Sequence, residues 1–242
     1  MDPRPIWLAR LKETFDDSLK SLTLTVHPSR AGLRGGGNPY TIYQYTITKP
    51  GLRWVVDRRY SECHRLHKQL VRSFRRTNSV LAGFLAPVAH IDFPKKRFVE
   101  DTRCIVGERK FKLQLFLRAC LQVRLALLAY TAVYYPNDGR QTNRLLDIVD
   151  HIDAFLAMPL QHREDDRRLT VSLLSLLQQR RSFGVIPSSQ VYLDDCAICL
   201  CECDATDVIT LPCTHAFHSD CVIPWIARDH SCPLCRTSAV TS

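Results

Sequence analysis

Residues 196–235 read CAICLCECDATDVITLPCTHAFHSDCVIPWIARDHSCPLC, and this stretch decides how the C-terminal part of the chain folds. Its cysteines and histidines follow the pattern C-x2-C-x13-C-x-H-x2-H-x2-C-x10-C-x2-C, which supplies four pairs of ligands. Thiolate and imidazole groups are the donors of closed tetrahedral zinc sites, and each such site needs four of them. The pattern therefore predicts two structural Zn²⁺ ions, held by Cys196, Cys199, Cys213, His215, His218, Cys221, Cys232 and Cys235.

Zinc binding would also supply folding free energy, because a segment of about 45 residues buries too little apolar area to fold alone. Two further cysteines, Cys201 and Cys203, follow Cys199 at one-residue gaps. We expect them to stay outside the metal sites, because only Cys196 and Cys199 keep the two-residue gap. Three more cysteines are scattered through the chain, so the sequence favours metal binding in a reducing cytosol over disulfides. These three are Cys63, Cys104 and Cys120.

The ligand spacing, together with the segment LPCTHAFH at residues 211–218, resembles the RING-H2 family over residues 193–236. The resemblance implies a cross-brace, in which the first and third ligand pairs hold one zinc and the second and fourth pairs hold the other. A zinc ribbon or a pair of fingers would instead join neighbouring pairs. In the cross-brace, one zinc takes Cys196, Cys199, His218 and Cys221, and the other takes Cys213, His215, Cys232 and Cys235.

RING domains that resemble this one bind a ubiquitin-charged E2 enzyme in a shallow apolar groove. The resemblance implies that Ile198, Trp225 and Pro233 line this groove here. Arg236 directly follows Cys235 and matches the cation that bridges E2 and ubiquitin in ligase RINGs. The planar donor fork of an arginine can serve both acceptors at once. The plain alternatives are core packing for Trp225 and an ordinary solvated side chain for Arg236.

The activity that the resemblance implies is that of a RING-type E3 ubiquitin ligase with no catalytic residue of its own. The cysteines near the site are predicted metal ligands or lack a positioned base, so none is expected to act as a nucleophile. Such a ligase would hold the E2-ubiquitin thioester in a reactive geometry, which is catalysis by orientation. The implied partners are an E2 enzyme, ubiquitin and an unknown protein substrate.

The first half of the chain carries a run of strand and helix signals. Apolar residues at helical spacing predict a helix over residues 6–20. Alternating apolar residues between Gly/Pro-containing turns predict an antiparallel meander. Its strands are expected over residues 21–26, 40–48 and 53–57.

Further helices are predicted after the meander. Residues 61–74, a stretch from residue 108 and residues 143–156 have helical spacing, whereas residues 75–107 show no sustained period and predict a long functional loop. Leucines within residues 160–190 predict a linker helix. It would pack on a neighbouring domain or, alternatively, support dimerisation.

Residues 58–62 read RRYSE at the junction of the third strand and its helix, and they are similar to the Arg-Arg-Tyr-Ser-Asp run of the PX (phox homology) family. The lysines after Pro94 and the helix residue Arg109 match the family's loop lysine and helix arginine in type and order. The order of strands and helices over residues 20–158 agrees with this resemblance. It implies a phosphoinositide-binding domain whose ligands are Arg59, Tyr60, Lys96 and Arg109.

The resemblance also implies a role for each of these side chains. Arg59 would pair with the 3-phosphate, since a guanidinium grips a phosphate with two parallel hydrogen bonds. Tyr60 would pack its ring under the inositol, Lys96 would meet the 1-phosphate, and Arg109 would hold the 4- and 5-hydroxyls. The alternative is a charged strand end with solvated lysines. Cys63 replaces the family's usual Phe and the customary Pro-x-x-Pro is missing, which leaves the lipid selectivity open.

Two further features of this region allow more than one interpretation. The apolar segment 80–88 could insert Leu81, Phe84 and Leu85 into a bilayer beside nearby arginines, or pack these side chains under the loop. Cys63, His64 and His67 could suggest a third metal site, but Cys63 and His67 fall on the predicted buried stripe of their helix and no fourth ligand is evident. We expect them to be structural.

The charge is unevenly distributed along the 242 residues. Residues 1–120 carry 23 Lys and Arg against 10 Asp and Glu, whereas residues 191–242 carry 2 against 7. A basic first half suits an anionic partner such as a phosphoinositide membrane. A nucleic-acid-binding zinc protein is the weaker interpretation and no nucleic acid is expected, because the zinc-binding part is the acidic part. The charged start predicts no signal peptide, and the run 125–135 is too short to span a bilayer.

The sequence thus predicts an α+β chain with a PX-like three-stranded antiparallel sheet and helical subdomain, plus a small zinc-stabilised cross-brace RING domain. The expected segments are an N-terminal helix (1–20), a PX-like domain (21–158), a linker (159–190), the RING-H2 domain (191–237) and a tail (238–242). The expected function is a ubiquitin ligase on the cytosolic face of endosomal or vacuolar membranes, bound to phosphatidylinositol 3-phosphate. The alternative is a non-enzymatic endosomal trafficking scaffold whose RING only docks proteins.

Overall fold

A computed structural model describes residues 4–32, 40–49, 52–76, 79–97, 101–134, 139–179, 195–203 and 208–239. Within it the chain divides into two compact units. One unit comprises Lys20–Leu127 and Asn143–Met158, and is called the sheet unit. The other comprises Met1–Leu19, Leu128–Thr142 and Pro159–Ser242, and is called the zinc-binding unit after its C-terminal cysteines and histidines.

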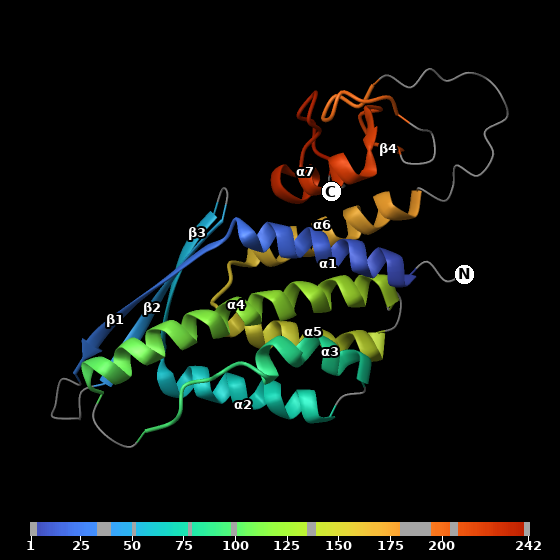
Figure 1. The fold of residues 1–242 in the computed structure, drawn as a ribbon. Helices are drawn as coiled ribbons and strands as arrows, with labels where there is room; N and C mark the ends of the chain where they lie inside the picture. The colour runs from blue at the N-terminus through green and yellow to red at the C-terminus, as the bar shows by residue number, and fades with distance from the viewer. Residues whose placement is uncertain are drawn as a thin grey trace. The chain divides into compact units, whose positions relative to one another are not determined.

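The sheet unit is built on the predicted antiparallel meander, in the order β1-β2-β3 (Figure 1). Tyr45 at the middle of β2 lies opposite Val26 of β1 and Val56 of β3, and all three are buried. Because side chains alternate across a strand, one face of the sheet carries the core and the other faces away from it. The strands are β1 (Thr23–Ala31), β2 (Tyr40–Lys49) and β3 (Leu52–Arg59).

Helix α2 (Tyr60–Arg76) begins at the residue after β3 and has the predicted apolar stripe, with Cys63, Leu66 and Leu70 buried. It packs against α3 (Ser79–Ala89), which lies inside the stretch predicted as a loop. The prediction of a loop was therefore wrong for residues 79–89. Nearly every residue of the segment is apolar, so it shows no contrast between faces from which a helical period could be recognised.

Helix α4 (Arg103–Tyr134) begins earlier than predicted and provides much of the core, with Leu113, Phe116 and Cys120 fully buried. Among the described residues it is the one helix long and apolar enough to cross a membrane, and 78% of its most apolar window is buried in the protein. Core helices of soluble proteins have the same composition, so this finding is weak support for a membrane span.

Helix α5 (Gly139–Phe155) is fixed to both the sheet and α4 within the sheet unit. The indole N–H of Trp54 on β3 donates to the carbonyl of Leu156 over 3.1 Å. Asp153 of α5 forms an ion pair with Arg124 of α4, and each side chain is only 1% exposed. A buried pair of this kind costs much to break, because the remaining charge would stay in a low-dielectric interior.

The zinc-binding unit contains α1 (Arg4–Lys20), α6 (Leu160–Gln179) and the small C-terminal elements. Helix α6 lies where a linker helix was predicted, and its leucines Leu169, Leu173, Leu176 and Leu177 are buried. Because these leucines are buried within the protein, their face is not available for dimerisation. The C-terminal elements are a two-stranded sheet of β4 (Val208–Thr210) and β5 (Ala216–His218), followed by α7 (Ser219–Asp229).

The α+β class predicted from the sequence is confirmed, with the three-stranded antiparallel sheet, the covering helices and the small Cys/His-rich domain all present.

Candidate functional site

The eight predicted zinc ligands come together in two groups of four. In each group all the potential ligand atoms lie within 4.8 Å of one another. The groups interleave along the chain, as a cross-brace requires and a linear ribbon does not. Their members are Cys196, Cys199, His218 and Cys221 in the first, and Cys213, His215, Cys232 and Cys235 in the second.

The local geometry of the first group suits a tetrahedral metal ion. Nδ1 of His218 lies 3.2 Å from Sγ of Cys199, a separation close to that of two ligands on one zinc. The other ring nitrogen, Nε2, lies 3.0 Å from the carbonyl oxygen of Glu202. When Nε2–H donates to that carbonyl, the imidazole keeps the tautomer that leaves Nδ1 able to bind metal.

Backbone hydrogen bonds favour the ionised form of a central thiol in this group. Burial raises the pKa of Cys196, but backbone hydrogen bonds at Cys199, His218 and Ile198 outweigh that effect and bring the pKa down to about 6. The thiolate is the form that binds metal. Four protein donors on each centre leave no open coordination position, so the donor set fits two structural Zn²⁺ ions.

In the second group, Nδ1 of His215 lies 3.6 Å from Sγ of Cys232. Hydrogen bonds from the side chain and backbone of Thr237 lower the pKa of Cys235 to about 6. Cys201 and Cys203 belong to neither group, as predicted from their spacing. Sγ of Cys201 lies 3.5 Å from the carbonyl oxygen of Cys199.

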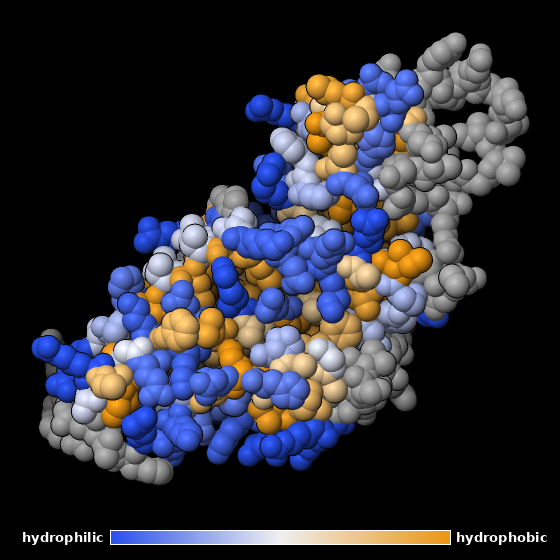
Figure 2. All heavy atoms as spheres, viewed as in Figure 1, coloured by the Kyte–Doolittle hydropathy of each residue, from blue (hydrophilic) through white to orange (hydrophobic). Residues whose placement is uncertain are grey.

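The three predicted groove residues differ in exposure. Ile198 is 37% exposed between the first two cysteines, while Trp225 and Pro233 are half-buried. The indole N–H of Trp225 on α7 donates to the carbonyl of Ser231 over 3.0 Å, which ties the ring to the segment that follows the helix. Apolar side chains are visible on the C-terminal domain in Figure 2, and the large exposed ones in this domain are Ile198, Leu200 and Leu234.

Arg236 is exposed immediately after the last cysteine, and its backbone has a φ of 59°. Its amide donates to the carbonyl of Cys232 over 2.9 Å and closes the turn that carries the last ligand pair. The ligand turn thus holds the backbone of this arginine, while the side chain points away from the core.

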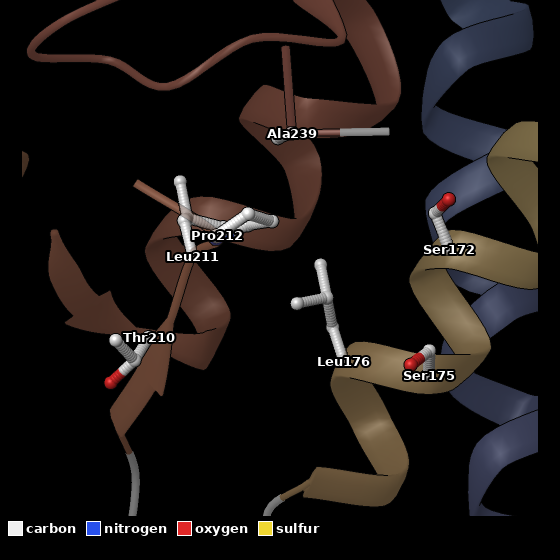
Figure 3. A pocket seen from close by; sticks show the side chains of 7 residues that line it. All are labelled: Ser172, Ser175, Leu176, Thr210, Leu211, Pro212 and Ala239. Carbon is white, nitrogen blue, oxygen red and sulfur yellow. The ribbon is translucent and has the colours of Figure 1, made fainter. Parts of the chain in front are cut away.

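A hollow of about 260 Å³ in the same unit is lined by side chains of α6 and of the C-terminal domain (Figure 3). Its lining contains hydroxyl and apolar groups and no acid, base or thiol, so it offers no chemistry of its own. The lining residues are Ser172, Ser175, Leu176, Thr210, Leu211, Pro212 and Ala239.

In the sheet unit, the structure brings together part of the predicted headgroup set. The guanidinium carbon of Arg109 lies 4.0 Å from the centre of the Tyr60 ring. The Tyr60 hydroxyl donates to the carbonyl of Pro94 over 2.8 Å and so holds the start of the segment that carries Lys96. Lys96 is exposed. Burial and the positive charges of Lys68 and Lys96 lower the pKa of the His64 imidazole on α2, so Lys96 lies close to that ring.

The two arginines of the RRYSE motif have different environments. Arg58 donates to the carbonyls of Phe155 over 2.8 Å and Ala154 over 3.1 Å, which ties β3 to the end of α5. Arg59 is exposed, and its guanidinium carbon lies 3.4 Å from the ring centre of Tyr40. Arg58 is therefore a structural residue, whereas Arg59 presents its charge at the surface.

The sequence interpretation missed one acidic residue of this region. Asp101 lies 2.5 Å from Arg109, and its second oxygen accepts a hydrogen bond from Thr41. The hydroxyl of the buried Tyr43 lies near this pair, and burial raises its pKa to about 12 although Arg109 acts to lower it. The acidic dipeptide at residues 100–101, which interrupts a basic stretch, was the signal in the sequence.

Three large apolar side chains of the segment 80–88 pack inward. Phe84 is 8%, Leu85 1% and Val88 0% exposed. Bilayer insertion of Phe84 and Leu85 is therefore wrong for this conformation, and the alternative of packing within the domain holds. The side chain of Leu81 lies outside the described residues.

Profiles of two protein families match the chain. The family described as Ring finger domain matches residues 194–236, and the family described as PX domain matches residues 47–134.

Curated relatives share the C-terminal region. The chain is 49% identical over 53 residues to "E3 ubiquitin-protein ligase RNF181" of Mus musculus, a match of 22% of this chain and 32% of the relative. It is 48% identical over 106 residues to the Xenopus tropicalis protein of the same name, 42% of this chain and 68% of the relative. "RING-H2 finger protein ATL13" of Arabidopsis thaliana is 46% identical over 52 residues, 21% of this chain and 11% of that protein. The chain thus spans only about a third of the mouse relative.

Among solved structures, the mouse SNX19 PX domain with bound sulphate ion matches with a TM-score of 0.31 and 20% identity, over 57% of this chain and 97% of that one.

Proposed function

The chain belongs to the RING-H2 finger proteins and carries a PX domain ahead of the finger, and on this premise we propose that it is a RING-type E3 ubiquitin ligase. The observation that carries the proposal is the pair of interleaved Cys/His groups. Two zinc ions held there would supply structure alone, because neither centre has a position for substrate. The ligase would act on an E2-ubiquitin thioester bound at its surface.

The groove residues would do the positioning. Ile198, Trp225 and Pro233 offer apolar surface to the E2, and Arg236 would donate hydrogen bonds to E2 and ubiquitin together. Holding the thioester in one conformation lowers the entropic part of the barrier.

A covalent route through the buried cysteines of the sheet unit has little support. Burial raises the pKa of Cys63 to about 12 and that of Cys120 well above its usual value, so neither is a thiolate at neutral pH.

We also assign the PX domain a role in recruitment. Arg59, Tyr60, Lys96 and Arg109 would bind phosphatidylinositol 3-phosphate on the cytosolic face of endosomal or vacuolar membranes. The contact of Arg109 with Tyr60 and the link from Tyr60 to Pro94 support one shared site for three of them. Confinement to a membrane would raise the effective concentration of the ligase near membrane-bound substrates.

An autoubiquitination assay with a panel of E2 enzymes tests the ligase. Chains should form with at least one E2 and be lost in Ile198→Ala, but not in Val171→Ala, which removes an even more exposed apolar side chain from α6. A trafficking scaffold that uses its RING only for docking would form no chains with any E2.

Liposome sedimentation across the phosphoinositides tests the recruitment. Arg59→Ala should abolish binding to 3-phosphoinositide vesicles. The control Arg53→Ala removes an exposed arginine from the same strand and should bind as the parent does.

A further inference from the structure

A carboxylate already faces the arginine at one end of the proposed headgroup site. Nη1 of Arg109 lies 2.5 Å from Oδ1 of Asp101, and the two side chains are 5% and 23% exposed. The other oxygen, Oδ2, accepts a hydrogen bond of 2.7 Å from the hydroxyl of Thr41 on β2. Both carboxylate oxygens are thus held by partners from separate elements, α4 and β2. This arrangement keeps the negative charge beside Arg109.

The arginine is held from another side as well. Its guanidinium lies over the ring of Tyr60, whose hydroxyl is in turn bonded to the carbonyl of Pro94. Asp101, Arg109 and Tyr60 therefore form one connected cluster, and Arg109 has little freedom to turn away from the carboxylate. Nε of Arg109 is buried without a hydrogen-bond partner among the described residues.

The two ends of the proposed site differ in charge. At Arg59 the guanidinium lies over the uncharged ring of Tyr40, so its positive charge remains available to a phosphate. At Arg109 the carboxylate of Asp101 cancels the charge of the guanidinium. Hydroxyl groups can bind to such a neutral pair, because the carboxylate accepts and the guanidinium donates. A phosphate at this end would meet the fixed charge of Asp101 within a few ångströms, where repulsion between like charges is strong.

We infer that Asp101 is a specificity-determining residue, which admits a headgroup with hydroxyls facing Arg109 and rejects one with a further phosphate there. The inference rests on the proposed function and specifies its ligand class. That class is a phosphoinositide with a single ring phosphate at the Arg59 end, bound in preference to the 3,4- and 3,5-bisphosphates.

The test compares vesicle affinities of the full chain and its variants. Vesicles contain phosphatidylinositol 3-phosphate, a 3,4-bisphosphate or a 3,5-bisphosphate, with total charge equalised by phosphatidylserine. Asp101→Asn keeps the shape and removes the charge. The matched control is Asp92→Asn, since Asp92 is an exposed carboxylate paired with Lys112.

The parent chain should prefer the monophosphate at least about tenfold, a difference of about 1.4 kcal/mol. Asp101→Asn should reduce that ratio by about fivefold or more, chiefly through tighter binding of the bisphosphates. Asp92→Asn should leave the ratio unchanged. Soluble inositol 1,3-bisphosphate should compete with the vesicles, since the headgroup and not the bilayer carries the recognition. If it does not compete, the inference is wrong.

A parent chain that binds no phosphoinositide vesicle refutes the proposed recruitment and this inference with it. If the parent chain binds but Asp101→Asn has the same ratio of monophosphate to bisphosphate affinity, only the inference is overturned. The inference is also overturned if Asp101→Asn and Asp92→Asn both gain affinity equally for all vesicles. If thermal unfolding shows that Asp101→Asn does not fold, Thr41→Val replaces it. That variant frees one carboxylate oxygen and should lower the ratio about two- to threefold, and no change would overturn the inference.

Discussion

His218 Nδ1 lies 3.2 Å from Cys199 Sγ, although the two residues are 19 positions apart and another ligand pair lies between them in the sequence. This contact defines the interleaved arrangement of the C-terminal domain. It also means that each metal ion would connect two separate segments, so the loss of one ion would loosen both.

Removing one ligand should remove one metal ion. The parent chain should contain about two equivalents of zinc, and Cys199→Ala or His218→Ala should each contain about one, because four donors are needed per ion. The double variant Cys199→Ala/His218→Ala should lose no more zinc than either single variant, since both belong to one site. Elemental analysis of the purified proteins measures this. Complete loss of zinc in the double variant would contradict the assigned grouping.

Breaking the buried Arg124–Asp153 pair should destabilise the sheet unit. Asp153→Asn leaves the guanidinium of Arg124 uncompensated in a site that is 1% exposed, and the free energy of unfolding should fall by about 3–5 kcal/mol. The double variant Arg124→Met/Asp153→Leu removes both charges and should recover part of that loss. Chemical denaturation followed by circular dichroism gives both values, and a single variant as stable as the parent would speak against a buried pair.

His67 should make the sheet unit sensitive to acid. Its ring stacks on Phe93 with centroids 4.3 Å apart, and burial and the nearby His64 lower its pKa below the usual 6.5. The neutral ring is therefore favoured by the fold. Its contribution to stability is complete above about pH 6.5 and is lost as the pH falls through the lowered pKa.

The measurement is the free energy of unfolding between pH 7.5 and pH 5 for the parent, for His67→Phe and for the control His27→Gln, an exposed residue of β1. His67→Phe should lose less stability on acidification than the parent, while His27→Gln should follow the parent. Identical pH profiles for His67→Phe and the parent would exclude His67 as the cause.

The Tyr60 hydroxyl should matter for lipid binding apart from the ring. Tyr60→Phe keeps the ring beneath Arg109 but loses the hydrogen bond to Pro94, which holds the segment that carries Lys96. Affinity for 3-phosphoinositide vesicles should fall about three- to tenfold, the effect of a hydrogen bond of about 1 kcal/mol. Tyr40→Phe, whose ring also contacts an arginine, is the matched variant and should change affinity less. A Tyr60→Phe protein that binds as the parent does would show that this hydrogen bond plays no part.

The sequence predicted the zinc-binding domain well because ligand spacing is a covalent property of the chain. The turn between Cys196 and Cys199 is encoded in four consecutive residues, whereas the inward packing of residues 80–88 depends on contact with α2. The full length of β1 was also missed. Its second half is a polar, exposed stretch, which lies opposite residues 40–44 of β2 and has no alternating pattern of its own.

The long-range polar contacts were the hardest to foresee. Asp101 meets Thr41 from 60 positions away, and nothing in either local segment indicates the other. Arg59 and Arg109 were found because they match positions of a known family, whereas the acidic dipeptide that contains Asp101 matches no family position. Hydrogen bonds between distant segments are set by the fold, so their partners can be read only from the structure.

The most direct test of the proposed ligase is the single-turnover discharge of a ubiquitin-charged E2 onto free lysine. The chain should accelerate discharge with at least one E2, and Arg236→Ala should lose most of that acceleration. Arg53→Ala, which removes an exposed arginine from β3, should keep it. If no E2 in a broad panel is discharged faster, or if Arg236→Ala and Arg53→Ala behave alike, the chain is not a ligase of this mechanism.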